Sequence, residues 1–430
     1  MDFKRGLDEW PTFTELILYG LQWLAISVPG VVIIGMLVGQ MHFGEASEVI
    51  LYLQKLFFIT AVTLGVQVLL GHRLPLVLGP AAVLLVGVVS SQGHELNTIY
   101  TSIMIGGAVL SLLSLLGLFP LVQRLFTPRV VALVLLLIAF TLAPSIMRLL
   151  CDVRSGIPPL FSLLFAMSLL VLLFLMHRVM RGVWKATLIV VAMAAGSLAH
   201  ALIFHPAPKT VVESSLPFIS GFWHNLTVQP TLDPGVLISF LCCYLALAIN
   251  DLGSIKSMGE ILKPPHMESR ISRGISITGA ANILAGYLGV LGPVNFSLSP
   301  GVVMASGCAS RYALLPTAFV LLLLSFSPVS LYLLTAIPGV VIGCVLLYIL
   351  CAQVAAGLMV AFDTPGGFLF QDGLILGFPL LLGTIIAFLP EPVLLSFPST
   401  LRPILGNGFV VGVLAVLLLE HLVLPRKSGS

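Results

Sequence analysis

The chain has 430 residues, of which 58% are hydrophobic and 9% are charged, and its mean hydropathy is +1.13. Soluble domains carry about 25% charged residues, so this composition excludes a soluble protein and predicts an all-α integral membrane protein with many spans. The formal net charge of +3 is carried mainly in short loops between apolar runs, which argues against a nucleic-acid partner.

Fourteen apolar runs follow one another along the chain. A full helical span needs roughly 20 residues, and the third and tenth runs are clearly shorter. We therefore predict 14 transmembrane segments, of which two are incomplete helices. The runs cover residues 16–38, 51–70, 76–90, 99–119, 130–149, 160–176, 184–204, 234–252, 271–291, 297–308, 313–325, 331–354, 374–389 and 403–424.

The lysines and arginines predict the orientation of these segments. With a cytoplasmic N-terminus, most basic residues, from Lys4 and Arg5 to Arg426 and Lys427, face the cytoplasm. The outer loops "GQMHFGEASE" and "SQGHELN" carry acids instead. We therefore expect a multi-pass protein of the inner (plasma) membrane with both termini in the cytoplasm. The outer segment 205–234, rich in proline and aromatic residues, is predicted to form an interfacial cap.

The two short runs are seven apart in a set of fourteen, and they read alike. One is "LGPAAVLLVGVVSS" and the other "LSPGVVMASGCAS". Seven is an odd number, so two consecutive halves, 1–205 and 206–430, would have opposite orientations. This arrangement is typical of inverted-repeat transporters, in which paired broken helices meet near the membrane midplane.

Broken helices need a physical reason, because unpaired backbone groups in a bilayer are costly. Two half-helices that begin at the midplane direct their positive N-terminal ends at one point, where free amides can bind an anion or a carbonyl. Gly79 and Gly301 would let a ligand approach the backbone closely. The alternative is that both runs are ordinary proline-kinked helices packed by small residues.

Distinctive stretches are "GHRLPLVLGPAAVLL" in the third span, "RGISITGAANILAGYLGVLGPVNFSLSPGVVMASGCASR" in the ninth and tenth, and "LQWLAISVP" in the first. Their resemblance is to the xanthine/uracil permease family, also called the nucleobase–ascorbate transporters. It implies a 7+7 inverted repeat with a core domain (about 12–125 and 232–326) and a gate domain (about 126–231 and 327–430). It also implies a homodimer, a relative movement of core and gate (an elevator mechanism), and a substrate held between the half-helices and span 8.

The chain departs from the family pattern at the residues expected to hold a nucleobase. The stretch "AINDLGSIKSMGE" places Asn250 where the family has a glutamate and Ser254 where it has an aspartate or histidine. In span 10, Leu298 and Ser299 stand at the family's acid–amide pair, while Gly301 fits. A carboxylate accepts ring N–H groups and can titrate, whereas asparagine cannot titrate and leucine can do neither.

Other polar residues near these spans complete the candidate binding set. Gln22 in span 1 corresponds to the family's glutamine, Ala82 would present its backbone N–H at the start of the half-helix, and Ser297 could line the opposing one. Asp251 is the candidate for proton or ion coupling, because an acid at membrane depth is costly and is usually functional. The alternative is a structural Asp251 paired with Lys256 or with free helix amides.

These observations favour a secondary transporter of a small polar solute, most simply a nucleobase such as uracil or xanthine. Coupling to H⁺ or Na⁺ and facilitated transport both stay open. An anion transporter resembling the sulfate permease family, with its substrate at the half-helix N-termini, is the main alternative. A receptor or an enzyme is a remote one, since no catalytic motif is present. The six cysteines show no metal spacing, and we expect neither a metal nor a cofactor.

Overall fold

The computed structural model describes residues 3–118, 125, 127–151, 157–180, 187–205, 217–363, 367–398 and 401–424. Arg426, Lys427 and the start of the predicted run 184–204 lie outside these residues. Within the described part, eight helices are long and apolar enough to cross a membrane. A ninth span results if Arg311–Ser325 and Pro328–Thr335, which meet at a bend of 93°, are taken as one.

The elements up to residue 205 are nearly all helical. Prolines begin two of these helices, as expected at a first turn whose N–H groups lack helical partners. The elements are α1 (Phe13–His42), α2 (Ala46–Leu69), β1 (Leu78–Pro80), α3 (Ala82–Ser90), α4 (Leu96–Leu115), α6 (Pro128–Thr141), α7 (Ala143–Leu150), α8 (Pro159–Val179) and α10 (Leu188–Phe204).

The remaining elements include a second short strand and half-helix. They are α11 (Pro234–Leu262), α12 (Met267–Leu288), β2 (Pro293–Asn295), α13 (Ser299–Ser306), the 3₁₀ turn η2 (Arg311–Leu314), α14 (Leu315–Ser325), α15 (Pro328–Thr335), α16 (Gly339–Phe362), α17 (Phe370–Ala387), α18 (Glu391–Leu395), α19 (Arg402–Leu405), α20 (Gly408–Leu418) and the π-helical turn η3 (Leu419–Val423).

The prediction of one run over residues 331–354 is wrong. The chain leaves α15 at Thr335, and Pro338 becomes the N-cap of α16. Proline lacks the N–H that a continuous helix would need there. Both predicted short runs, in contrast, are short helices preceded by a strand, namely β1 with α3 and β2 with α13.

The two strands pair with each other in an antiparallel ladder. Leu78 faces Asn295, Gly79 faces Val294, and Pro80 faces Pro293. All six strand residues are buried. Residues more than 200 positions apart are therefore joined where the two broken runs begin, and each strand supplies backbone partners that a broken span would otherwise lack.

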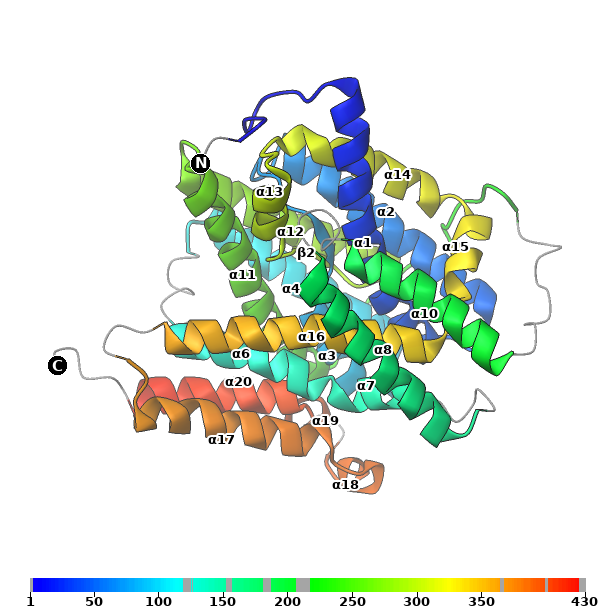
Figure 1. Cartoon of the computed structure of the whole chain (residues 1–430). Coiled ribbons are helices and arrows are strands. Elements are labelled where there is room, and N and C mark those ends of the chain that lie inside the picture. Colours follow the sequence, from blue (N-terminus) through cyan, green and yellow to red (C-terminus); the bar gives the residue numbers. More distant parts are fainter. Residues whose placement is uncertain are drawn as a thin grey trace.

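The helices pack in two groups, which Figure 1 shows one above the other. The lower group contains α6, α7, α16, α17 and α20, and the upper group contains both strands with α1, α2, α4, α11, α12, α13 and α14. Half-helix α3 packs mainly on α11 of the upper group. Contacts between the groups run mainly through α11 and α3, which meet α6, α19 and α20. The half-helices thus belong to one group and lie beside the other.

The N-terminal segment is fastened to the chain that leaves α13. Lys4 N–H donates to the Gly307 carbonyl at 2.8 Å, and Arg311 N–H donates to the Leu7 carbonyl at 3.1 Å. Trp10 stacks on Tyr312 with ring centroids 4.1 Å apart. Residues 4–10 consequently hold the C-terminal end of the second half-helix in place.

Candidate substrate site

The half-helices are fixed by hydrogen bonds that cross between the two broken runs. Phe296 N–H donates to the Val77 carbonyl at 2.8 Å, and Ala81 N–H donates to the Gly292 carbonyl at 3.0 Å. The buried Ser299 hydroxyl accepts from Val77 N–H at 3.1 Å and donates to the Phe296 carbonyl at 2.8 Å. Ser299 was predicted to line the site, and its hydroxyl is engaged in holding the strands and α13 together.

Gly79 serves a different purpose from the one expected. A Cβ atom at Gly79 would lie 2.6 Å from Cζ of Phe296, and one at Gly30 would lie 3.3 Å from Cε2 of the same ring. These two glycines therefore make room for the chain's own phenyl ring. The space beside Gly79 that was expected to admit a ligand is occupied by the Phe296 ring in this structure.

Gly301 does leave the backbone accessible. A Cβ atom there would meet no atom within 4 Å, and Ser297, Leu298 and Met304 beside it are also exposed. Gly301 N–H lies in the first turn of α13, where a helix has no acceptor of its own for N–H groups. Ala82 is the first residue of α3, so its N–H also lies in a first turn. Within the described part of the chain, both half-helices therefore have first-turn amides without a helical acceptor.

Helix α11 packs against β2 and α13 and brings the span 8 candidates to this region. The Asn250 side chain is half-buried, and a Cβ atom at the exposed Gly253 would meet open space. The Ser254 hydroxyl is fully buried and lies 2.8 Å from the Asn250 carbonyl and 3.1 Å from the Asn295 carbonyl. Ser254 is thus committed to the scaffold, whereas the Asn250 amide can contact a ligand.

Asp251 is completely buried and is bound by an asparagine that our sequence reasoning missed. One carboxylate oxygen, Oδ1, accepts from Asn295 Nδ2 at 2.7 Å and from Asn295 N–H at 3.2 Å. Lys256, the partner considered from the sequence, is exposed on the surface of α11. The partners of Asp251 are a side-chain amide and a backbone N–H of strand β2, not the free helix amides considered from the sequence.

His72 extends this network into the turn before β1. Its Nδ1 accepts from Leu74 N–H at 3.0 Å, so Nε2 carries the proton and donates to Asn295 Oδ1 at 3.2 Å. Arg270 donates to the carbonyl oxygens of His72 and Arg73 at 3.1 and 2.9 Å. The turn "GHRLP" is therefore held by β2 and α12. An isolated asparagine in the apolar stretch "LGVLGPVNF" was the sequence signal for this hub.

Gln22 occupies a buried position on α1, which packs along β1 and α3. Its Nε2 has no hydrogen-bond partner within the described part of the chain. A buried amide donor without a partner is costly, so this group is available to a ligand.

Comparison with known proteins decides the family. A family model for xanthine and uracil permeases, described as the permease family, matches residues 14–392. The chain belongs to this permease family. It is accordingly a membrane transporter and not an enzyme. The uric acid permease PucK of Bacillus subtilis is 23% identical over 97% of this chain and 97% of its own length. The nucleobase transporter PlUacP of Paenibacillus larvae is 23% identical over 95% and 94%.

Solved structures share the fold of this permease. The transmembrane domain of the cyanobacterial bicarbonate transporter BicA has a TM-score of 0.64, with 16% identity, over 88% of this chain and 97% of its own. The murine anion transporter Slc26a9 in its inward-facing state has a TM-score of 0.60, with 13% identity, over 95% of this chain and 68% of its own.

Proposed function

We propose that this permease is a secondary transporter of planar oxo-heterocycles of the nucleobase class. The observation that carries the proposal is the pair of half-helices, joined through β1 and β2, with unpaired amides in their first turns and open space at Gly301. Relatives aligned over nearly the whole chain are named as a uric acid permease and a nucleobase transporter. Carbonyl-bearing heterocycles are suitable ligands for such amides.

Within this site, backbone amides bind the ligand in place of the carboxylates that the family pattern has and this chain lacks. The N–H groups of Ala82 and Gly301 bind ring carbonyls, and the Asn250 and Gln22 side chains contact the ring edge as donors and acceptors. Ser297 and Leu298 line the exposed side of α13. Ser254 and Ser299 position the two half-helices.

The proposal includes an arrangement of 14 spans as a 7+7 inverted repeat. The antiparallel pairing of β1 with β2, each leading into a half-helix, supports a two-fold relation between residues 1–205 and 206–430. The core is then 12–125 with 232–326, and the gate is 126–231 with 327–430. Transport follows an elevator movement of the core against the gate in a homodimer of the inner membrane, with cytoplasmic termini.

The first test removes backbone access at Gly301. Gly301→Val adds a side chain into open space, so we expect the fold to persist and binding of xanthine and uric acid to fall at least tenfold. Gly65→Val is the matched control, since a Cβ atom at Gly65 in α2 also meets nothing within 4 Å. The measurement is ligand-induced thermal stabilisation of the purified protein. Unchanged affinity in Gly301→Val would remove α13 from the site.

The second test concerns coupling, for which we propose Asp251. Asp251→Asn keeps an oxygen that can accept from Asn295, so the network in the core survives while the titratable group is lost. We expect uptake of radiolabelled uracil into proteoliposomes to lose its response to a pH gradient. The same uptake is also measured under a sodium gradient. Uptake that still follows the pH gradient would exclude Asp251 as the proton carrier.

An anion transporter is the second candidate, and one observation favours it. Asn250 and Leu298 stand where the family pattern has acids, so the site contains amides and no carboxylate at these positions. An anion site at helix N-termini requires such a composition. Thermal stabilisation by sulfate or bicarbonate, with none by nucleobases, would replace the first proposal by this one.

A further inference from the structure

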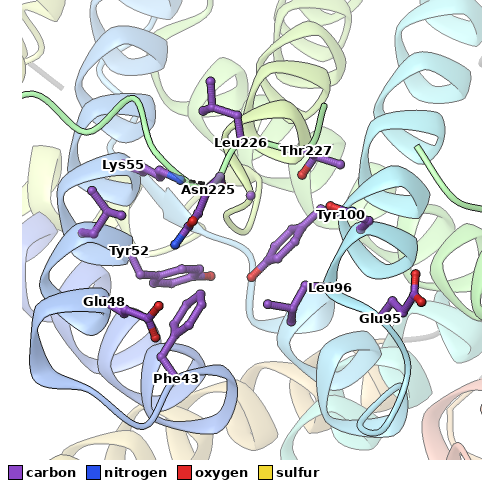
Figure 2. Close-up of a pocket in the computed structure, with 13 residues that line it drawn as sticks. Phe43, Glu48, Tyr52, Lys55, Glu95, Leu96, Tyr100, Asn225, Leu226 and Thr227 are labelled. Carbon is purple, nitrogen blue, oxygen red and sulfur yellow. Dashed lines mark hydrogen bonds between the residues drawn. The ribbon is translucent and has the colours of Figure 1, made fainter. Parts of the chain in front are cut away.

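A cavity lies away from the half-helices, on the side that the sequence predicts to be outer (Figure 2). Its volume is about 740 Å³, within the usual range of small-molecule sites. The lining comes from the end of α1, from α2, from the start of α4, from residues 225–227 and from Gly289 after α12. We call it the Lys55 pocket. None of the candidate substrate-site residues lines it.

Lys55 is the reason to regard this cavity as a binding site. Its side chain is only 3% exposed, and its Nζ donates to the Asn225 carbonyl at 2.8 Å. No carboxylate lies within ion-pair distance of it in the described part of the chain. An ammonium group has three N–H donors, and one neutral carbonyl does not compensate a buried charge. The pocket wall therefore carries a cation whose charge is unmatched.

The fold does not depend on Lys55 to hold the cap over the pocket. Segment 217–233 is anchored elsewhere, because Ser220 N–H donates to the Phe326 carbonyl at 3.0 Å, and Phe222 is buried against Phe58 and Phe326. Thr227 N–H also donates to the Tyr287 carbonyl at 2.9 Å. A ligand can consequently replace the Asn225 carbonyl on Lys55 while the cap stays in place.

Flat, rigid walls define the shape of the ligand. Figure 2 shows the rings of Phe43, Tyr52 and Tyr100 around the cavity, with the two tyrosine hydroxyls directed toward each other. The Tyr52 hydroxyl accepts from Leu291 N–H at 3.2 Å, and the Tyr100 hydroxyl is 3.0 Å from His42 Nδ1. These bonds fix the ring positions, and aromatic faces favour a planar, aromatic ligand.

Acidic residues on other parts of the lining define the far edge of the ligand. Glu48 lies seven residues before Lys55 on α2, so the two are about 10 Å apart along the helix axis. Glu95 is exposed just before α4, and Asn97 lies two residues further along the chain. Carboxylates accept N–H groups and repel anions that have no such donors. The pocket thus matches a molecule with one anionic edge and one N–H edge.

We propose that the Lys55 pocket is a second ligand site of this permease, specific for planar heteroaromatic anions that carry ring N–H groups. The anionic edge binds Lys55, the ring stacks within the aromatic walls, and ring N–H groups donate to Glu48. This assignment goes beyond the transport site, since it involves no residue of the half-helices.

The test is the stoichiometry of urate binding to the full-length protein in lipid nanodiscs, measured by equilibrium dialysis. We expect two urate molecules per chain in the wild type and one in Lys55→Met, which keeps the apolar stem and removes the charge. Lys256→Met, an exposed lysine of α11, is the matched control and should retain two. Glu48→Gln, at a half-exposed residue, should weaken the second site severalfold and admit sulfate as a competitor.

A comparison of variants distinguishes the Lys55 pocket from the proposed transport site. Gly301→Val should lose one urate and keep the Lys55-dependent one, and the double variant should bind none. Failure of the transport-site proposal would appear as unchanged binding in Gly301→Val alone. Unchanged stoichiometry in Lys55→Met, or competition by sulfate as strong in the wild type as in Glu48→Gln, would overturn the second site. If Lys55→Met does not fold, the Glu48→Gln result decides.

Discussion

The charged side chains of this permease differ sharply in surroundings. Arg129 of α6 lies 2.7 Å from Asp372 of α17 and 3.1 Å from Glu420 of η3, and all three side chains are more than nine-tenths buried. Arg5 lies 2.6 Å from Glu9 and 2.9 Å from Glu15, whose side chains are 48% and 32% exposed. Water already solvates the charges of the Arg5 cluster. The buried charges of the Arg129 cluster, in contrast, are stabilised only by one another.

This contrast predicts very different costs for the same substitution. Arg129→Met leaves two buried carboxylates without a cation, and we expect it to destabilise the protein by about 3–5 kcal/mol. Arg5→Met removes solvent-exposed ion pairs, and because water already solvates these charges we expect little change in the free energy of unfolding. Reversible unfolding in mixed micelles measures both. Equal losses in the two variants would contradict the argument from burial.

At the scale of elements, α4 and α12 approach each other through glycines. A Cβ atom at Gly279 would lie 2.6 Å from Ser111 N and 2.7 Å from the Gly107 oxygen, and one at Gly286 would lie 2.6 Å from the Tyr100 oxygen. Small residues let helix backbones pack closely in membranes, where dispersion contacts replace the hydrophobic effect between helices. The packing of α4 against α12 stabilises the helices beside the two half-helices and also one wall of the Lys55 pocket.

Gly279→Ala should therefore separate the two helices and cost about 1–3 kcal/mol by overpacking. Gly65→Ala is the matched comparison, because the new methyl group in α2 meets nothing within 4 Å. There the gain in helix propensity should stabilise the protein by about 0.5–1 kcal/mol. Melting temperatures of the two variants should move in opposite directions. A lower melting temperature in both would contradict the argument from packing, because the methyl group at Gly65 meets no neighbouring atom.

Elements also mark the limit of what the sequence could predict. The breaks before α3 and α13 were predictable, since Gly-Pro or Ser-Pro beside a short apolar run is a local signal. The separation of α15 from α16 was missed, although Pro338 was its local signal. The bond between Asp251 and Asn295 was not predictable by spacing, because it depends on strands paired across more than 200 residues. The burial of Lys55 was not predictable either, because it depends on the cap.

At the scale of the whole molecule, one residue joins the two helix groups. Asn407 precedes α20, where its Oδ1 accepts from Phe409 N–H at 3.0 Å. Its Nδ2 donates across to Ser90 of α3 at 2.8 Å and to Ser239 of α11 at 2.9 Å. The end of the first half-helix is thus linked to the lower group by a side chain that also caps a helix. If the groups move during transport, these two bonds must break.

Asn407→Ser should separate the two roles, because serine is also a good N-cap but is too short to bridge. Two bonds of about 1 kcal/mol each favour the arrangement seen here, so their loss shifts the balance of conformations by roughly 30-fold. We expect the initial rate of substrate exchange in proteoliposomes to change severalfold while the ligand Kd stays within twofold. Ser90→Ala with Ser239→Ala removes the same bridge from the other side and should reproduce the effect. A change in Kd without a change in rate would place Asn407 in the binding site instead of between the moving groups.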